Sequence, residues 1–170
     1  MESYSKQDEL FILVPDYQSK TEFSLGNRAH AEVVGGMNKF IQGLRIFRRG
    51  NELIKKYGIN FITTQDSSFT GLIGRALRFF NRGIKLEIQL HGDLFSSDYY
   101  KKDFIRYLLS KSNIKSADKI RVASHRNKES LIKKLEIDKR KVRIKPVVIN
   151  NGCFKNYKLS TNKFFHLKLY

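Results

Sequence analysis

The chain has 170 residues, the length of one domain, and 41% of them are hydrophobic, which is enough to form a packed core. Its single cysteine, Cys153, excludes an internal disulfide framework and a cysteine-based zinc site. The first nine residues are polar, unlike a secretion signal, and no stretch holds the roughly 18 to 20 apolar residues needed to cross a bilayer. We therefore expect a soluble or peripheral protein in a reducing compartment.

Positive charge is the most unusual feature of the composition, with a formal net charge of +17 at pH 7. It is concentrated in residues 101–145, which contain sixteen Lys or Arg residues and five Asp or Glu residues. A field of this sign attracts anionic lipid surfaces, nucleic acids or phosphorylated substrates. A lysine-rich solvated surface explains the same composition equally well. Charge alone leaves both interpretations open.

Short apolar segments alternate with longer amphipathic ones along the chain. The apolar run 10–14 predicts a buried strand that Pro15 ends, and the three-and-four spacing over 37–57 predicts a helix that Gly58 stops. The other predicted elements are a short edge strand at 29–34, strands at 59–64, 86–90 and 120–123, helices at 72–80 and 128–135, and an extended segment at 142–149. This alternation predicts an α/β fold, with right-handed crossovers and a mostly parallel sheet flanked by helices.

One more helix is predicted around residues 104–109. Its apolar positions, which we expect to form a buried stripe, are Phe104, Ile105, Leu108 and Leu109. The aromatic residues Tyr99, Tyr100, Phe104 and Tyr107 could instead stack on nucleic-acid bases. Because Phe104 and Tyr107 fit the buried stripe of this helix, packing is the preferred interpretation.

The periodic pattern ends near residue 150. Residues 1–150 are therefore predicted to form one domain. Residues 151–170 are mostly polar and predict a linker that leads into the start of another unit.

Two polar segments are expected at the carboxyl edge of the sheet, where open α/β sheets bind ligands. Residues 63–66 (Thr-Thr-Gln-Asp) follow one predicted strand, and residues 91–93 (His-Gly-Asp) follow the next. A side chain that ends a buried strand is held rigidly, and a glycine after it lets a substrate approach the backbone. Ser67 and Ser68 are placed to cap the following helix, whose N-terminus favours an anion such as phosphate.

A family resemblance is carried by residues 62–66, 69–74 and 85–93, followed by residues 117–124 at a suitable distance. Over residues 8–155 the sequence resembles the N-terminal domain of the family-4 retaining glycosyltransferases. These enzymes have the GT-B architecture, in which two Rossmann-like domains face each other across a cleft. The resemblance implies that this chain is the acceptor-side half of such a fold. A nucleotide-diphosphate sugar would be the donor substrate, held mainly by the other domain, with no further cofactor.

The resemblance also implies roles for single residues. His91 matches the family's histidine that faces the cleft near the donor sugar, so its implied role is a hydrogen bond to the sugar or to the leaving phosphate. The other residues expected to bind substrate are Asp66, Gly92, Asp93 and Ser124. A loop-end histidine bonded to its own backbone, and aspartates that cap helices or form turns, are the structural alternatives. His91 and Asp93 lack a third ligand at a suitable spacing, so no metal site is predicted.

Three departures from the family pattern stand out. The sequence begins at the equivalent of the family's first helix, after its first strand and glycine-rich loop, and the paired glutamates of the donor domain are absent. Residues 124–126 read Ser-His-Arg where relatives have Ser-Glu-Arg. We therefore expect a domain truncated at both ends that is inactive alone, or one that works with a separately encoded donor domain.

The sequence thus predicts a hexosyltransferase domain acting on a glycan or lipid-linked acceptor, in the synthesis of cell-envelope polysaccharide. Its expected location is the cytoplasm, including the inner face of the membrane. The alternative is a non-enzymatic basic α/β module that binds nucleic acid or anionic membrane. The sequence has no zinc finger, aromatic RNA-binding box or GXXG loop, so charge alone supports binding to nucleic acid, and that partner is not expected.

Overall fold

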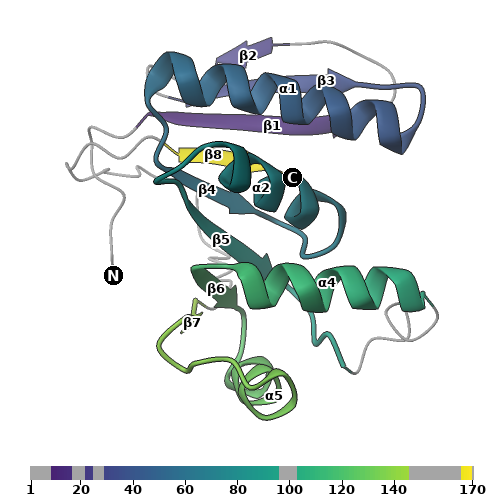
Figure 1. The fold of residues 1–170 in the computed structure, drawn as a ribbon, viewed down its shortest axis with the longest axis vertical. Coiled ribbons are helices and arrows are strands. Elements are labelled where there is room, and N and C mark those ends of the chain that lie inside the picture. Colours follow the sequence, from purple (N-terminus) through teal and green to yellow (C-terminus); the bar gives the residue numbers. More distant parts are fainter. Residues whose placement is uncertain (1–8, 17–21, 25–28, 96–102, 146–165, 170) are drawn as a thin grey trace, which may run out of the picture.

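A computed structural model describes residues 9–16, 22–24, 29–95, 103–145 and 166–169. In this part of the chain the strands form one eight-stranded sheet, in the order β2-β3-β1-β8-β4-β5-β6-β7 (Figure 1). All neighbouring strands pair in parallel except β2 and β3, which are antiparallel. The strands are β1 (Leu10–Asp16), β2 (Glu22–Ser24), β3 (Ala29–Gly35), β4 (Phe61–Thr64), β5 (Lys85–Leu90), β6 (Lys119–Val122), β7 (Val142–Ile144) and β8 (His166–Leu169). The predicted α/β fold with a mostly parallel sheet is confirmed.

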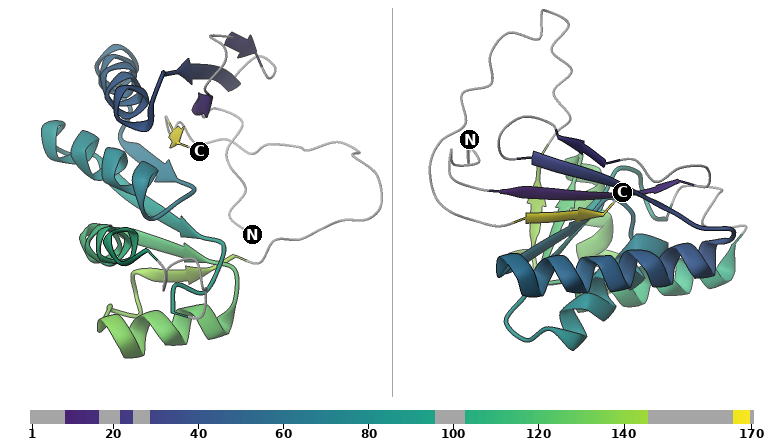
Figure 2. Two further views of the ribbon diagram at one scale, coloured as in Figure 1. Left: turned by 90° about the vertical axis from the view of Figure 1, so that its right-hand side faces the viewer. Right: turned by 90° about the horizontal axis from the view of Figure 1, so that it is seen from above.

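Helices flank the sheet and connect its parallel strands. They are α1 (Lys39–Tyr57), α2 (Phe69–Phe80), α4 (Phe104–Ser116) and α5 (His125–Leu135). The chain advances across the sheet in one direction from β3 through β4, β5 and β6 to β7. Right-handed crossovers that advance in one direction place their helices on the same face. Figure 2 accordingly shows α1, α2 and α4 on one side of the sheet.

The ends of α1 follow the signals in the sequence. The side chain of Asn38 accepts a hydrogen bond from the backbone N–H of Ile41 at 2.9 Å, and Gly58 ends the helix in the left-handed conformation. Gly50 is buried within the helix, which continues through it without a break. One turn of α1 is tied to β3, because Arg49 donates a hydrogen bond to Glu32 at 2.6 Å.

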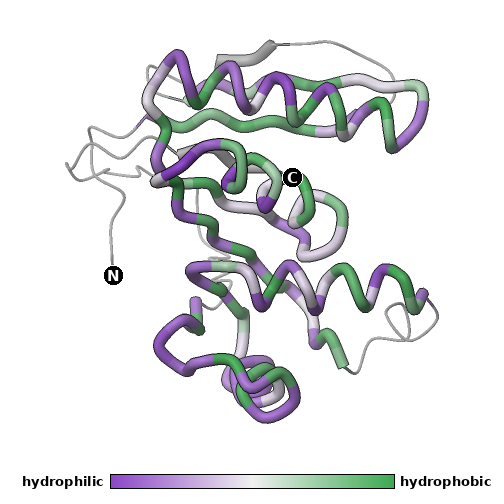
Figure 3. Tube along the Cα trace, in the orientation of Figure 1, coloured by the Kyte–Doolittle hydropathy of each residue, from purple (hydrophilic) through white to green (hydrophobic). Residues whose placement is uncertain are grey.

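The first strands differ from the prediction in one respect. Residues 29–35 form a strand, as predicted, but this strand is not at the edge of the sheet, because β2 pairs along its outer side. Only three residues form β2, and the sequence pattern predicted no element for them. Figure 3 shows the contrast between β1, which is hydrophobic along most of its length, and α1, in which hydrophobic and hydrophilic residues alternate.

The main core lies between the helices and the sheet. On β5 the side chains of Leu86, Ile88 and Leu90 are buried in it, and Ile120 and Val122 of β6 continue this layer. Helix α2 approaches the sheet closely at Gly74. A Cβ atom at this position would lie 2.7 Å from the Cγ2 atom of Thr64 and 2.9 Å from the Cδ1 atom of Leu86.

The opposite face of β4 and β5 is polar. Gln89 donates a hydrogen bond from its Nε2 atom to the Oγ1 atom of Thr63 at 2.9 Å. The Thr63 hydroxyl donates in turn to the carboxylate of Glu87 at 3.3 Å. These contacts satisfy polar groups that would be costly to leave unpaired in a half-buried layer.

The predicted buried stripe of α4 is wrong at three of its four positions, and the fourth, Leu109, is half-buried. Phe104, Ile105 and Leu108 are exposed, and the buried residues of this helix are Ser110, Asn113 and Ile114. The physical reason is a specific polar contact with the residues that precede α2. The Nδ2 atom of Asn113 donates hydrogen bonds to the backbone carbonyls of Ser67 and Ser68, both at 3.0 Å. These bonds turn a polar face of α4 inward and leave its apolar face in solvent.

Of the two aromatic residues expected to be buried in α4, only Tyr107 packs against the core, where it is partly buried. At Gly71 a Cβ atom would lie 3.1 Å from the backbone carbonyl oxygen of Asp66, which is a tight contact, and 3.4 Å from the Nδ2 atom of Asn113 on α4. Tyr99 and Tyr100 lie outside the described residues.

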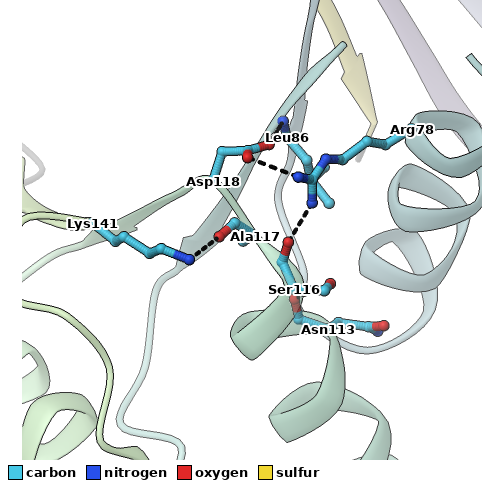
Figure 4. A network of polar contacts seen from close by, with 7 residues as sticks. All are labelled: Arg78, Leu86, Asn113, Ser116, Ala117, Asp118 and Lys141. Carbon is cyan, nitrogen blue, oxygen red and sulfur yellow. Dashed lines mark hydrogen bonds and ion pairs between the residues drawn. The ribbon is translucent and has the colours of Figure 1, made fainter. Parts of the chain in front are cut away.

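A polar network joins α2, β5 and the start of β6 at the amino edge of the sheet (Figure 4). Asp118 accepts a hydrogen bond from the guanidinium of Arg78 at 2.8 Å and one from the backbone N–H of Leu86 at 2.9 Å. Arg78 also donates to the backbone carbonyl of Ser116. This network lies at the edge opposite to the one where ligands are expected, so it supports the fold rather than the site.

The predicted domain boundary at residue 150 falls outside the described residues. Residues 166–169, which the sequence-based division places with the linker and the next unit, form β8 and pair with both β1 and β4. These four residues therefore lie in the middle of the sheet.

Candidate functional site

The carboxyl ends of β4 and β5 bring two polar side chains into direct contact. The strands are neighbours in parallel register, so the residues that follow them, Gln65 and His91, leave the sheet at the same edge. The Nε2 atom of His91 lies 2.8 Å from the Oε1 atom of Gln65. With the Gln65 amide oxygen facing the ring, the proton of this hydrogen bond is on the His91 Nε2 atom, and the Gln65 Nε2 atom is buried without a hydrogen-bond partner among the described residues. In the neutral ring the Nδ1 atom is then an acceptor.

The partner of His91 is thus the side chain that follows the neighbouring strand β4, not the backbone of its own loop. The imidazole is exposed, and a Cβ atom added at Gly92 would meet no atom within 4 Å. Space is therefore open beside the ring. A group that approaches from solvent can reach both the ring and the backbone of Gly92.

Asp93 is held in the loop that follows. Its Oδ1 atom accepts a hydrogen bond from the backbone N–H of Phe95 at 2.9 Å, the geometry of a tight turn. Its Oδ2 atom lies 3.7 Å from the Nε atom of Arg126, at the start of α5. The Arg126 side chain is largely exposed, so this ion pair contributes little to stability, and the guanidinium stays accessible to an anion at the edge of the sheet.

Asp66 occupies the N-terminus of α2. Its carboxylate accepts a hydrogen bond from the Ser68 hydroxyl at 2.9 Å and one from the backbone N–H of Thr70 at 3.3 Å. The expected capping by the serines is not found, because Ser68 precedes the helix but makes no side-chain capping bond. The negative charge of Asp66 already complements the helix dipole and would repel a phosphate at this position.

Ser124 caps α5, since its Oγ atom accepts a hydrogen bond from the backbone N–H of Asn127 at 3.2 Å. The hydroxyl proton of Ser124 is not used in this bond. The structure therefore gives Asp66, Asp93 and Ser124 local roles at the edge of the sheet, and their binding of substrate stays a prediction.

Sequence reasoning did not single out Gln65 or Arg126 as site residues. Both are polar residues that follow predicted strands, and Arg126 also matches the arginine of the Ser-Glu-Arg segment in the family pattern. Among the described residues, no group of three or more His, Cys, Asp or Glu side chains could hold a metal ion. Cys153 lies outside the described residues.

The comparison with known protein families decides to which family the chain belongs. A family model described as Glycosyltransferase Family 4 matches residues 4–152, which is most of the chain. The chain belongs to glycosyltransferase family 4. No curated protein matches the sequence at a significant level. The family resemblance stated from residues 62–66, 69–74 and 85–93 is confirmed.

Family membership makes this a glycosyltransferase-type domain with a Rossmann-like α/β fold, and it corresponds to the N-terminal domain of the family. In such a sheet the ligand edge is the carboxyl one. In this family-4 domain that edge carries the His91–Gln65 contact and the Asp93–Arg126 pair. None of the helices in the described part of the domain is long and apolar enough to cross a bilayer.

Proposed function

We propose that this family-4 domain holds the acceptor during transfer of a hexose from a nucleotide-diphosphate sugar, with retention, to a glycan or lipid-linked acceptor. The observation that supports this most directly is the exposed imidazole of His91, oriented by Gln65 and bordered by open space at Gly92. The donor would be held mainly by a second domain, in the same chain or separately encoded, and no further cofactor is needed. Cell-envelope polysaccharide synthesis in the cytoplasm is the setting that we propose.

The chemistry follows from what the side chains can donate and accept. While its Nε2 atom stays bonded to Gln65, a doubly protonated His91 ring can donate a hydrogen bond from Nδ1 to a sugar hydroxyl or to the charge that develops on the leaving phosphate. Arg126 offers a second cationic donor at the same edge. Asp93 and Asp66 are acceptors for hydroxyls of the acceptor sugar, and the Ser124 hydroxyl can donate to one.

The test of this function is reconstitution. We expect the 170-residue chain alone to release no nucleoside diphosphate from any nucleotide sugar above background. The same chain joined to the donor domain of a family-4 glycosyltransferase should release it only when an acceptor is present. The measurement is nucleoside diphosphate release, with separate detection of the glycosylated acceptor. Turnover by the chain alone would show that donor binding does not need a second domain, and would overturn this division of labour.

A membrane surface is the second partner that we propose. The helices of an α/β sheet begin at its carboxyl edge, because they run antiparallel to the strands. Exposed apolar residues stand there, with Met37 and Phe40 at the start of α1 and Phe104 and Ile105 at the start of α4. Residues 101–145 carry a net charge of +11, part of which, such as Lys115 and Lys119, lies toward the opposite edge. Apolar side chains beside basic ones are typical of surfaces that bind anionic membranes, and a lipid-linked acceptor would be presented at such a surface.

Binding to liposomes tests this partner. We expect binding to vesicles with anionic lipid that falls as salt is raised, because each basic residue near the surface contributes about 1 kcal/mol and the attraction is screened over about 8 Å. Phe104→Ser should weaken binding about tenfold, since it removes an apolar side chain that is 68% exposed at this edge.

The matched control is Phe79→Ser, because Phe79 is 79% exposed at the end of α2, on the opposite edge. We expect Phe79→Ser to bind as the unchanged chain does. Equal binding to neutral and anionic vesicles at low salt, or equal losses in the two variants, would argue against this membrane surface.

A further inference from the structure

A strand of four residues, β8, lies at the centre of the sheet. Strand β8 lies between β1 and β4, with Leu167 opposite Phe11 on one side and opposite Ile62 on the other (Figure 1). Neighbouring strands are about 4.8 Å apart, so β1 and β4 are separated by about twice that distance. They are too far apart to pair with each other. The sheet is continuous only because β8 is there.

The four residues of β8 join two blocks of the fold. One block contains β2, β3 and β1, and the other contains β4, β5, β6 and β7. Apart from β8, the main contact between the two blocks in the described part of the chain is α1 against α2. Without β8, one side of β1 and one side of β4 would present unpaired backbone N–H and C=O groups in the middle of the sheet. Buried backbone groups without partners are costly.

The way in which β8 is attached makes it separable from the sheet. It is four residues long, and it follows β7, which lies at the far edge, with β6, β5 and β4 in between. The chain from Lys145 to His166 is long enough to span these strands, and the entropic cost of closing such a loop grows slowly with its length. Strand β8 is therefore held by its backbone pairing, not by a tight connection to its neighbours.

We propose that the space between β1 and β4 is a strand-acceptor site, in which residues 166–169 of the same chain bind by pairing with both neighbouring strands. Addition of an extended segment to a sheet is a general mode of peptide recognition, in which main-chain hydrogen bonds provide most of the affinity. Binding of β8 sets the position of the block that carries β1 and β3 relative to the block that carries Gln65 and His91. Release of β8 would separate the two halves of the carboxyl edge. This inference does not depend on the proposed sugar transfer.

The experiment compares two substitutions at one position in the full chain, Lys168→Pro and Lys168→Ala. Both remove the lysine side chain, but only proline removes the backbone N–H and disfavours a central strand. Hydrogen exchange of backbone amides is the measurement. For Lys168→Pro we expect exchange in β1 and β4 to be more than tenfold faster than in the unchanged chain, with a much smaller change in β6. Lys168→Ala should behave as the unchanged chain does.

A peptide of residues 163–170 then tests whether the site accepts a separate strand. The linked segment has an effective concentration on the order of millimolar, so a millimolar peptide should fill the site in the Lys168→Pro chain and restore slow exchange in β1 and β4. The same peptide with proline at position 168 should have no effect. If the Lys168→Pro chain unfolds entirely, recovery of protection with the unchanged peptide still supports the proposal.

Three results would overturn it. Unchanged protection of β1 and β4 in Lys168→Pro would show that β8 is not their partner. Lost protection that the unchanged peptide does not restore would show that the space accepts no separate strand. A full-length dimer that Lys168→Pro converts to monomer would show that the occupant is β8 of a second copy.

Discussion

Replacing His91 with alanine is expected to lower turnover by about 100- to 1000-fold in the chain joined to a family-4 donor domain, the scale for losing one preoriented hydrogen-bond donor in a transition state. His91 ends β5, and its ring is oriented by the hydrogen bond between its Nε2 atom and Gln65. Its exposed position leaves it few core contacts, so the free energy of unfolding should change by less than about 0.5 kcal/mol. The loss should appear mainly in kcat.

Two further substitutions distinguish the hydrogen bond that His91 donates to its ligand from the orientation of the His91 ring by Gln65. His91→Asn keeps a donor with a shorter reach, so its turnover should lie between those of the unchanged protein and His91→Ala. Gln65→Ala removes the partner of the ring and should lower kcat about tenfold, by loosening its orientation. His30→Ala is the control, because His30 is an exposed histidine near the amino end of β3. Full activity in His91→Ala together with a destabilised fold would show that the histidine is structural.

Much of the fold could be predicted because its signals are local. The run 10–14, the spacing of apolar residues over 37–57 and the stop at Gly58 each specify one element without reference to distant residues. The inward face of α4 could not be predicted, because it depends on hydrogen bonds from Asn113 to carbonyls more than forty residues away. Hydrophobic periodicity contains no information about such a contact.

The position of β8 could not be predicted either, because it also depends on residues that are distant in the sequence. Four residues in an otherwise polar region carry little periodic signal, and their place in the sheet is set by the space between β1 and β4. Strand β2 is missed in the same way, since a three-residue strand at the edge of a sheet depends on its partner β3.

The candidate site was predicted at the level of strand ends, but not at the level of side-chain contacts. The loops after β4 and β5 were expected at one edge, and the structure brings Gln65 and His91 together there. The pair formed by Asp93 and Arg126 joins two loops that the sequence does not link. The contacts of Asp66 and Ser124 are local instead, because they are with residues two to four positions away in the sequence.

The amino edge of the sheet provides the largest expected effect on stability. Asp118→Ala should lower the free energy of unfolding by about 2 to 3 kcal/mol, because hydrogen bonds to charged groups are stronger than neutral ones and an unpaired buried donor adds a penalty. Asp118 lies just before β6, and its Oδ2 atom accepts the backbone N–H of Leu86, whose side chain is fully buried. The carboxylate thus extends the pairing of β5 by one hydrogen bond beyond the first paired residues, Glu87 and Lys119. The other oxygen, Oδ1, accepts from Arg78 and ties the end of α2 to the same point.

Urea unfolding followed by circular dichroism measures this effect. Asp118→Asn keeps an acceptor for Leu86 but loses the charge that pairs with Arg78, so about half of the destabilisation should remain. The control is Glu52→Ala, which removes an exposed carboxylate 3.1 Å from Arg49 and should cost less than about 0.5 kcal/mol. Because Asp118 stands at the amino edge and His91 at the carboxyl edge, Asp118→Ala should also leave kcat unchanged at temperatures where the protein stays folded. An unfolding midpoint for Asp118→Ala that equals the midpoint for Glu52→Ala would show that solvent screens the network, and that the backbone of β5 and β6 holds this edge without it.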